Sequence, residues 1–201
     1  MTVTTDHRTS QADRTPLEIS PEVRANLQQV LTTLRTHLGM DVAFVSEFLG
    51  ANRIFQAVDT GAPISAVETG AVLPMAAGYC RHVVAGMLPE LMPDTSAVPL
   101  ARSIDETRTI PIGAHLSVPI ETTDGRIFGT FCCFSHAAKP GLGPSHLELV
   151  RTLSRLIAQE LSQEVRRLER EAGRMHARHA LMNNGRPMTL AELLKAAPPA
   201  R

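Results

Sequence analysis

Three cysteines and their neighbours are the residues of this sequence best suited to chemistry. Cys132 and Cys133 are adjacent in the stretch GRIFGTFCCFSHAAKP, and Cys80 lies in GYCRH. A thiol can act as a nucleophile, a redox group or a metal ligand when it is accessible and its pKa is lowered. A buried free cysteine instead packs as a small hydrophobic side chain. The elements that carry the three cysteines decide between these roles.

The adjacent cysteines lie in a predicted β-hairpin. Two runs of alternating side chains are joined by Asp124-Gly125, a dipeptide typical of two-residue hairpin turns. With that turn, Ser117 lies opposite Cys132, and neighbouring residues of a strand point to opposite faces. We therefore expect Cys133 in the core and Cys132 on the other face. A three-residue loop or a bulge would reverse this assignment.

The two faces of the predicted hairpin differ in composition. The apolar face, expected to pack in the core, carries Leu116, Val118, Ile120, Ile127, Phe131 and Cys133. The mixed face, which has the composition of a pocket wall, carries His115, Ser117, Pro119, Glu121, Phe128, Thr130, Cys132 and Phe134. A metal site or a disulfide that uses both adjacent cysteines is disfavoured, because their side chains point apart.

Other candidate residues lie between the two predicted hairpins. Cys80 and His82 are two positions apart on a short predicted helix, so only one of them can face a pocket. Arg108 lies in an irregular segment, where an arginine suits an anionic ligand. The alternative for Arg108 is a solvated side chain that pairs with Asp105 or Glu106. Motifs of phosphate loops, metalloproteases and serine hydrolases do not occur in the sequence, so these enzyme classes are disfavoured.

The composition is that of one packed domain. Of the 201 residues, 43% are hydrophobic and 20% are charged, and the formal net charge is zero. A neutral chain gives no electrostatic reason to expect nucleic acid or an anionic membrane as a partner. No apolar run approaches the roughly 20 residues that a membrane span needs. The first residues also lack the apolar core of a secretory signal, so a cytoplasmic protein is expected.

The order of predicted elements is that of an α+β domain. A helix from Pro21 to the residue before Gly39 precedes two strands, 40–50 and 52–59, joined by a hairpin. Residues 60–75 are expected to be a loop. They are followed by a short helix (76–86), a short strand (89–94), an irregular segment with a short helix (95–113), the cysteine hairpin and a last helix (145–172).

Three stretches of the chain resemble a bacterial GAF domain. They are GMDVAFVSEF, GYCRHVVAGMLPELMPD and IPIGAHLSVPIETTDGRIFGTFCCFSH. The stretches are similar to those of GAF sensor modules found upstream of EAL or GGDEF cyclic-di-GMP signalling domains. Residues 1–20 are polar and lack periodicity, so they are expected to be a disordered lead-in, and residues 21–170 are expected to be the GAF domain. Residues 171–201 are expected to be a basic linker, a short helix and a Pro-rich tail.

The resemblance implies a fold and a function. It implies a central antiparallel sheet with the first and last helices on one face and a loop- and helix-covered pocket on the other. The predicted protein is a non-enzymatic sensory or regulatory module that binds an unidentified small molecule and signals through a homodimer of its terminal helices. The partner would be a downstream signalling domain or protein. The residues predicted to line or border the pocket are Tyr79, Cys80, Arg108, His115, Ser117, Thr130 and Cys132.

Two alternative functions remain open from the sequence. A thiol-based redox sensor or reductase would use Cys80 and Cys132, and a ligand-free dimerisation module would need neither. No catalytic residue or metal ligand is predicted, and the sequence does not indicate which cofactor, if any, the protein binds. GAF domains that attach a bilin use a Cys followed directly by His, whereas Arg81 follows Cys80 here, which argues against a chromophore.

Overall fold

The computed structural model describes residues 15–62 and 67–182, with side chains to residue 175. The chain divides into two compact units, one ending at Ser162 and the other beginning at Gln163. The fold described below is that of the first unit. The predicted lead-in falls mostly outside the described residues, and the predicted short helix of the tail falls wholly outside them.

One six-stranded antiparallel sheet forms the centre of the first unit. Its strands lie in the order β3-β2-β1-β6-β5-β4. They are β1 (Val42–Leu49), β2 (Asn52–Thr60), β3 (Val72–Pro74), β4 (Leu91–Met92), β5 (Ala114–Glu121) and β6 (Ile127–Ser135). The helices are α1 (Pro21–Leu38), α2 (Tyr79–Val84), α3 (Pro99–Ser103), α4 (Asp105–Thr109) and α5 (Pro144–Met182), with 3-10 turns η2 (Met75–Ala77) and η3 (Thr95–Ala97).

Helix α1 begins and ends where its residues predict. The Ser20 hydroxyl accepts a hydrogen bond from the Val23 amide at 3.4 Å, and proline occupies the first turn, where its missing N–H costs nothing. Gly39 ends the helix with φ of +61°, a conformation that glycine adopts without strain. The buried stripe Leu27, Leu31 and Leu34 then faces the sheet.

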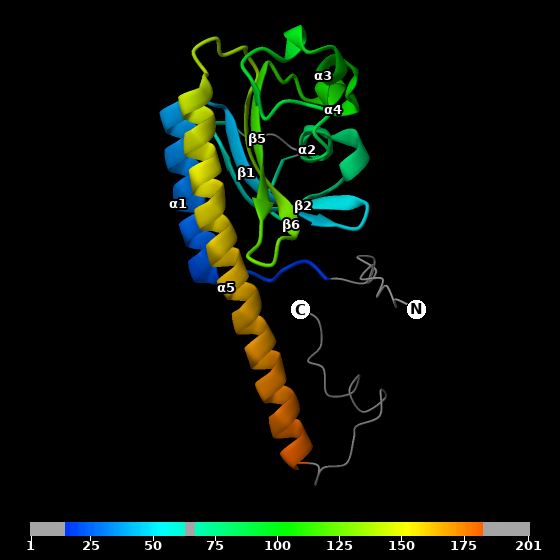
Figure 1. Ribbon diagram of the computed structural model, residues 1–201, viewed down its shortest axis with the longest axis vertical. Coiled ribbons are helices and arrows are strands. Elements are labelled where there is room, and N and C mark those ends of the chain that lie inside the picture. The colour runs from blue at the N-terminus through cyan, green and yellow to red at the C-terminus, as the bar shows by residue number, and fades with distance from the viewer. Residues whose placement is uncertain (1–14, 63–66, 183–201) are drawn as a thin grey trace, which may run out of the picture. The chain divides into compact units, whose positions relative to one another are not determined.

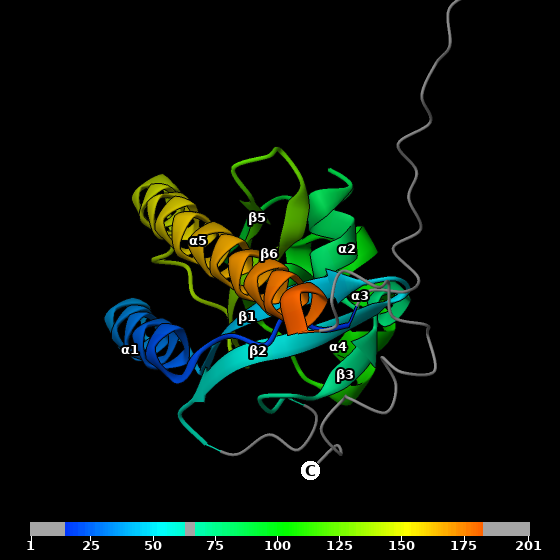
Figure 2. The same ribbon diagram turned by 90° about the horizontal axis from the view of Figure 1, so that it is seen from below.

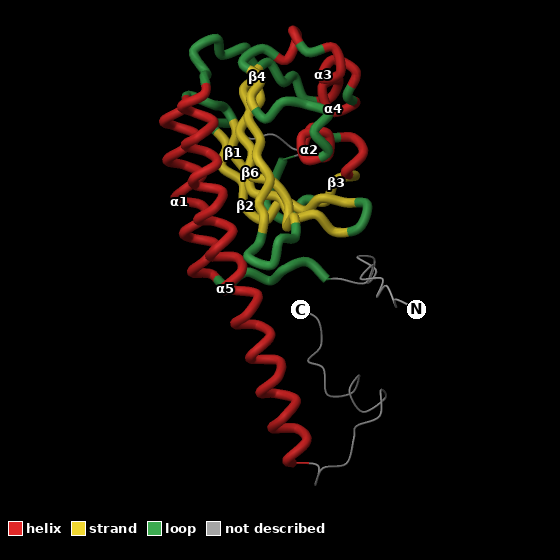
Figure 3. The backbone as a smooth tube through the Cα atoms, viewed as in Figure 1, coloured by secondary structure: helices red, strands yellow, loops and turns green. Residues whose placement is uncertain are grey.

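The sheet separates two layers of helices. Helix α1 and the first part of α5 lie on one face of the sheet, and α2, α3 and α4 lie on the other (Figures 1 and 2). The strands between these helices are yellow in Figure 3. Each face has its own apolar core, called here the helix-side core and the cover-side core. The predicted α+β arrangement, with the terminal helices on one face, is confirmed.

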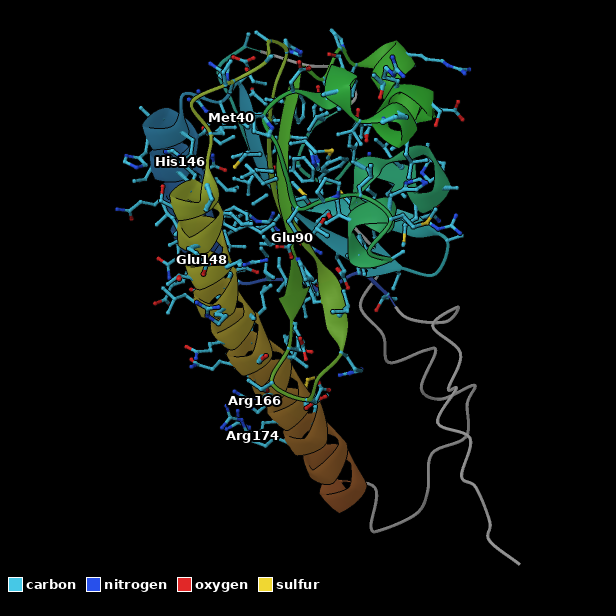
Figure 4. The ribbon with its side chains drawn as sticks, turned by 45° about the horizontal axis from the view of Figure 1, so that its top comes forward. Met40, Glu90, His146, Glu148, Arg166 and Arg174 are labelled. Atoms are coloured by element: carbon cyan, nitrogen blue, oxygen red, sulfur yellow. The ribbon has the colours of Figure 1, made fainter. Side chains whose placement is uncertain are left out.

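Polar contacts fix the first part of α5 on the sheet. Arg151 forms ion pairs with Glu90, beside β4, at 2.6 Å and with Glu148 at 2.6 Å. Figure 4 labels Glu148 on α5 and Glu90 beside the sheet. The Ser154 hydroxyl donates to the Pro119 carbonyl at 2.8 Å, a carbonyl of β5. These contacts orient the first turns of α5 along β5.

The cysteine hairpin has a different turn from the predicted one, yet most of its pairing is as predicted. The loop is closed by the Thr122 amide donating to the Arg126 carbonyl, which leaves three residues in the loop, with Gly125 at φ of +80°. A register shift between Ile120 and Glu121 then compensates for the extra residue. Ser117 therefore pairs with Cys132, as predicted.

Between the loop and the bulge, two predicted side-chain orientations are wrong. Phe128, predicted on the mixed face, packs against the helix-side core. Ile127, predicted in the core, lines a cavity of about 270 Å³ with Phe48 and Arg81. Since a one-residue shift reverses every side chain until it is compensated, only the residues inside the shifted stretch are affected.

Three element predictions need correction. Residues 60–75, predicted as loop, contain the edge strand β3, which pairs with β2. The segment 95–113 contains two short helices and a 3-10 turn rather than a single helix. Helix α5 continues to Met182, beyond the predicted end at residue 172. None of the helices in the described part of the chain has the length and hydrophobicity of a membrane span.

Candidate functional site

A group of buried polar side chains lies in the cover-side core, between the sheet and α2. Each member is at most 2% exposed, and we call the group the buried polar cluster. It consists of Ser46, Arg53, Cys80, His115, Ser117, Thr130 and Cys132. Polar groups inside an apolar core cost free energy unless they are hydrogen-bonded, so the partners of each member matter.

Arg53 is the charged centre of the cluster. It comes from β2, and its guanidinium lies 5.2 Å from the centre of the Phe55 ring. One terminal nitrogen, Nη1, donates to Cys80 Sγ at 3.3 Å, and the other, Nη2, forms an ion pair with Glu106. Burial opposes the charge of Arg53, but the acidic groups of Cys80 and Glu106 outweigh it and raise the pKa of the guanidinium. Arg53 is therefore a buried permanent cation.

Glu106 neutralises this cation from the cover. Its side chain is 10% exposed and comes from α4, a helix of five residues. One carboxylate oxygen pairs with Arg53, and the other accepts a hydrogen bond from the Tyr79 amide at 3.2 Å. Gly78 permits this arrangement, because a Cβ at that position would lie 2.7 Å from Arg53 Nη1. The carboxylate thus joins α4 to β2 and α2.

Two thiols of the cluster are in contact. Cys80 Sγ lies 3.5 Å from Cys132 Sγ, and Ser117 Oγ lies 2.9 Å from Cys132 Sγ. The hydrogen bond with Cys132 and the charge of Arg53 lower the pKa of Cys80, although burial opposes them. Burial and the neighbouring Cys80 raise the pKa of Cys132. Cys80 is therefore the thiol of this pair that more readily becomes a thiolate.

His115 is buried beside the Arg53 guanidinium and is itself uncharged. Its ring centre lies 4.7 Å from that of Tyr79, with 34° between the ring planes. Burial and the charge of Arg53 lower the pKa of His115 to about 3, so the ring is neutral at physiological pH. Among the described residues, the buried side-chain nitrogens without a hydrogen-bond partner are His115 Nδ1 and Arg53 Nε.

The structure brings six of the seven predicted site residues together. Tyr79 and Cys80 come from α2, His115 and Ser117 from β5, and Thr130 and Cys132 from β6. Thr130 pairs with Ser46 of β1, hydroxyl to hydroxyl, at 2.9 Å. As predicted, Cys132 faces the cover, whereas Cys133 lies in the helix-side core, where burial raises its pKa to about 12.

Arg108 is not part of this site, which corrects its predicted place at the pocket. Its side chain is 73% exposed and lies 3.6 Å from Asp105, the solvated pairing that the sequence left open. In so short a helix, Glu106 faces inward and Arg108, two positions later, faces outward. Neither Glu106 nor Arg53 is among the pocket residues predicted from the sequence. The one available signal was that Arg53 lies two positions before the apolar Phe55 in β2, so the two side chains share a face of the strand.

Comparison with known proteins identifies the family of this chain. A protein-family model described as GAF domain matches residues 22–161. The chain is a GAF domain. The search of curated proteins gave no match.

Solved structures, among them two of GAF domains, have the same fold. The blue-light absorbing form of the Thermosynechococcus elongatus PixJ GAF domain is 15% identical, with a TM-score of 0.59, over 78% of this chain and 94% of that one. The type II free methionine-R-sulfoxide reductase of Thermoplasma acidophilum is 13% identical, with a TM-score of 0.55, over 68% and 90%. The GAF domain of the Acinetobacter phosphoenolpyruvate-protein phosphotransferase is 13% identical, with a TM-score of 0.55, over 71% and 83%.

The chemistry available to the buried polar cluster is narrow. Among the side chains that the structure describes, those of residues 15–62 and 67–175, no three His, Cys, Asp or Glu gather as a metal site would require. The cluster instead offers a guanidinium, several hydroxyl groups and two thiols in contact. A guanidinium binds anions, and a thiol pair can be oxidised to a disulfide.

Proposed function

We propose that this GAF domain is a non-enzymatic sensory module that binds a small molecule at the buried polar cluster. The ligand would contact Arg53 and the predicted residues on α2, β5 and β6. Its binding would change the pose of the α2–α4 cover, and α1 and α5 would pass the change to a second copy and to a downstream signalling domain or protein.

One observation carries this proposal: the cover-side core holds a buried cation and two polar nitrogens without partners. Arg53 is 2% exposed, and neither Arg53 Nε nor His115 Nδ1 has a hydrogen-bond partner. A buried donor or acceptor without a partner costs about 1–3 kcal/mol, and well-packed apolar residues would avoid this cost. Such groups cluster at functional sites, where a ligand can satisfy them.

The proposed dimer face is the groove between α1 and the first part of α5. The groove has a volume of about 660 Å³ and is lined by apolar residues of both helices, including Val30 and Leu153, and by polar residues at its sides, including Gln29 and Glu160. Leu149 and Leu156 of α5 are 36% and 55% exposed. Exposed leucines in helical register favour association of helices, so a second copy of the chain is the proposed occupant.

Native mass spectrometry of the full chain tests the ligand proposal. The expected result is a small molecule retained by the wild-type protein and by Arg108→Met, but lost from Arg53→Met. Arg108→Met is the matched control, because it removes an exposed arginine from the cover without touching the cluster. A wild-type protein that carries no small molecule, and whose thermal midpoint no compound in a metabolite panel raises, would contradict the proposal.

A thiol redox sensor is the second candidate, favoured by the 3.5 Å contact between Cys80 and Cys132. A hydroperoxide would oxidise the Cys80 thiolate to a sulfenic acid. Cys132 would then attack that sulfur, releasing water and leaving a disulfide. Peroxide treatment followed by intact-mass analysis should show the loss of two hydrogens. Cys133→Ser should still show this loss, and Cys80→Ser should not. Unchanged mass in the wild type would exclude the redox candidate.

A further inference from the structure

The ion pair between Arg53 and Glu106 is asymmetric in its burial. Arg53 is 2% exposed and belongs to the sheet, whereas Glu106 is 10% exposed and belongs to a five-residue helix of the cover. Arg53 cannot leave the core without disrupting β2, since it lies between Asn52 and Ile54, which both pair with β3. Glu106 is therefore the partner that can leave the ion pair at lower cost, since a short surface helix can move without disrupting the sheet.

The Glu106 carboxylate also satisfies Arg53 incompletely. It contacts the Nη2 side of the guanidinium, and its second oxygen accepts from the Tyr79 amide. The Nε nitrogen of Arg53 remains without a partner. Nε and one terminal nitrogen of an arginine form a fork that matches the two oxygens of a carboxylate. A free carboxylate can therefore make a hydrogen bond to Arg53 that Glu106 does not make.

From this geometry we propose that Arg53 is an anion-binding site that Glu106 occupies as an internal substitute. A small molecule with a carboxylate group takes the place of Glu106 on Arg53, and α4 is then released from the sheet. This proposal rests on the proposed ligand-binding function and names the chemical class of the ligand.

Few polar contacts hold α4 against α2 and β2, so release of Glu106 would loosen the cover. The polar contacts of α4 with α2 and β2 are those of Glu106 and the 2.7 Å contact between Thr107 Oγ1 and the Tyr79 hydroxyl. The Thr107 hydroxyl also donates to the Ala101 carbonyl of α3 at 2.9 Å, a contact within the cover. When the carboxylate of the ligand replaces that of Glu106 on Arg53, binding at the buried site therefore leads to movement of the surface helix α4.

Chemical rescue tests the site with acetate as the probe. Glu106→Ala should lower the thermal midpoint of the full chain, and acetate should restore part of the loss with a saturable dependence. For a Kd on the order of 10 mM, 100 mM acetate should raise the midpoint by roughly 3–5 °C. Equal concentrations of chloride and of acetamide, the neutral analogue, should have no such effect.

Two control variants keep the result specific. Asp105→Ala removes an exposed carboxylate from the same helix and should show no response to acetate. Glu106→Ala combined with Arg53→Met should lose the response. If Glu106→Ala does not fold in chloride, the thermal midpoint is replaced by the yield of folded protein after dilution from urea. That yield is then compared between acetate and chloride. No difference between acetate and chloride in either measurement would overturn the proposal.

Tryptic cleavage after Arg108 reports the release of α4. Glu106→Ala should be cleaved there faster than the wild type, and acetate should not reverse this, because acetate fills the site without tethering the helix. Equal cleavage rates in the two proteins would refute the release of α4. A small molecule retained by the wild type, without acetate rescue of Glu106→Ala, would leave the ligand-binding function standing and refute this site. Acetate rescue of Glu106→Ala without any molecule retained by the wild type would support this site and count against the ligand-binding function.

Discussion

Acid should destabilise this protein through His115, and the effect is large enough to isolate. The native pKa of His115 is about 3, against 6.5 for an ordinary histidine. Between these two values, the unfolded chain binds a proton that the native protein does not bind. Stability is therefore lost as the pH falls below about 6.5, and the loss levels off near pH 3. The physical cause is burial, reinforced by the neighbouring cation Arg53.

The size of the effect follows from the two pKa values. At pH 7 both states are mostly neutral, and at pH 5 the unfolded histidine is mostly protonated. The free energy of unfolding should therefore fall by about 2 kcal/mol between pH 7 and pH 5 on account of this single group. The burial of the ring, which is 2% exposed, means that no solvent screening reduces the figure.

Urea unfolding at pH 7 and pH 5 measures this difference. His115→Phe keeps an aromatic ring against Tyr79 and removes the titration. The loss of stability between the two pH values should then be about 2 kcal/mol smaller in the variant than in the wild type. His37→Gln, a change at an exposed histidine of α1, serves as the control for general effects of acid. If the wild type and His115→Phe lose the same stability, then His115 is not a buried neutral histidine and the reasoning fails.

Two further predictions concern the packing of the cover and the sheet. Gly129→Ala should cost more than about 3 kcal/mol or prevent folding, because its Cβ would lie 1.8 Å from the Ser46 carbonyl oxygen. Gly141→Ala, where a Cβ meets nothing within 4 Å, should change the urea midpoint little, and equal effects would contradict the close approach of β1 to Gly129. Tyr79→Phe should cost about 1 kcal/mol, since it removes the hydroxyl that contacts Thr107. A variant as stable as the wild type in the same urea assay would show that this contact is not formed.

The turn of the cysteine hairpin was predicted incorrectly, yet the orientations of its two cysteines were predicted correctly. The prediction assumed a two-residue loop at Asp124-Gly125, and the structure has a three-residue loop and a compensating bulge. The orientation of Cys132 and Cys133 was predicted correctly because the apolar pattern of the strand fixes which face is buried. The orientation of Ile127 was wrong, since it lies inside the shifted stretch.

The charged centre of the site could not be predicted in the same way. Arg53 lies in a strand near a hairpin turn, where an arginine is commonly solvated, and its partner Glu106 is distant in the sequence. Only the packing of α4 over α2 brings the two together, and no local pattern encodes that contact. The prediction for Arg108 failed for a related reason, because helical phase in a five-residue helix cannot be assigned from its own residues.

A crystal structure of the full-length Glu106→Ala variant, grown in acetate, tests most directly whether the buried polar cluster binds an anion. We predict one acetate ion with its oxygens on the Arg53 guanidinium, at hydrogen-bond distance from Nε and Nη2. Arg53 should keep its contact with Cys80. An Arg53 side chain that has turned away from the cluster, or a cluster filled by neighbouring side chains with no anion, would contradict the account.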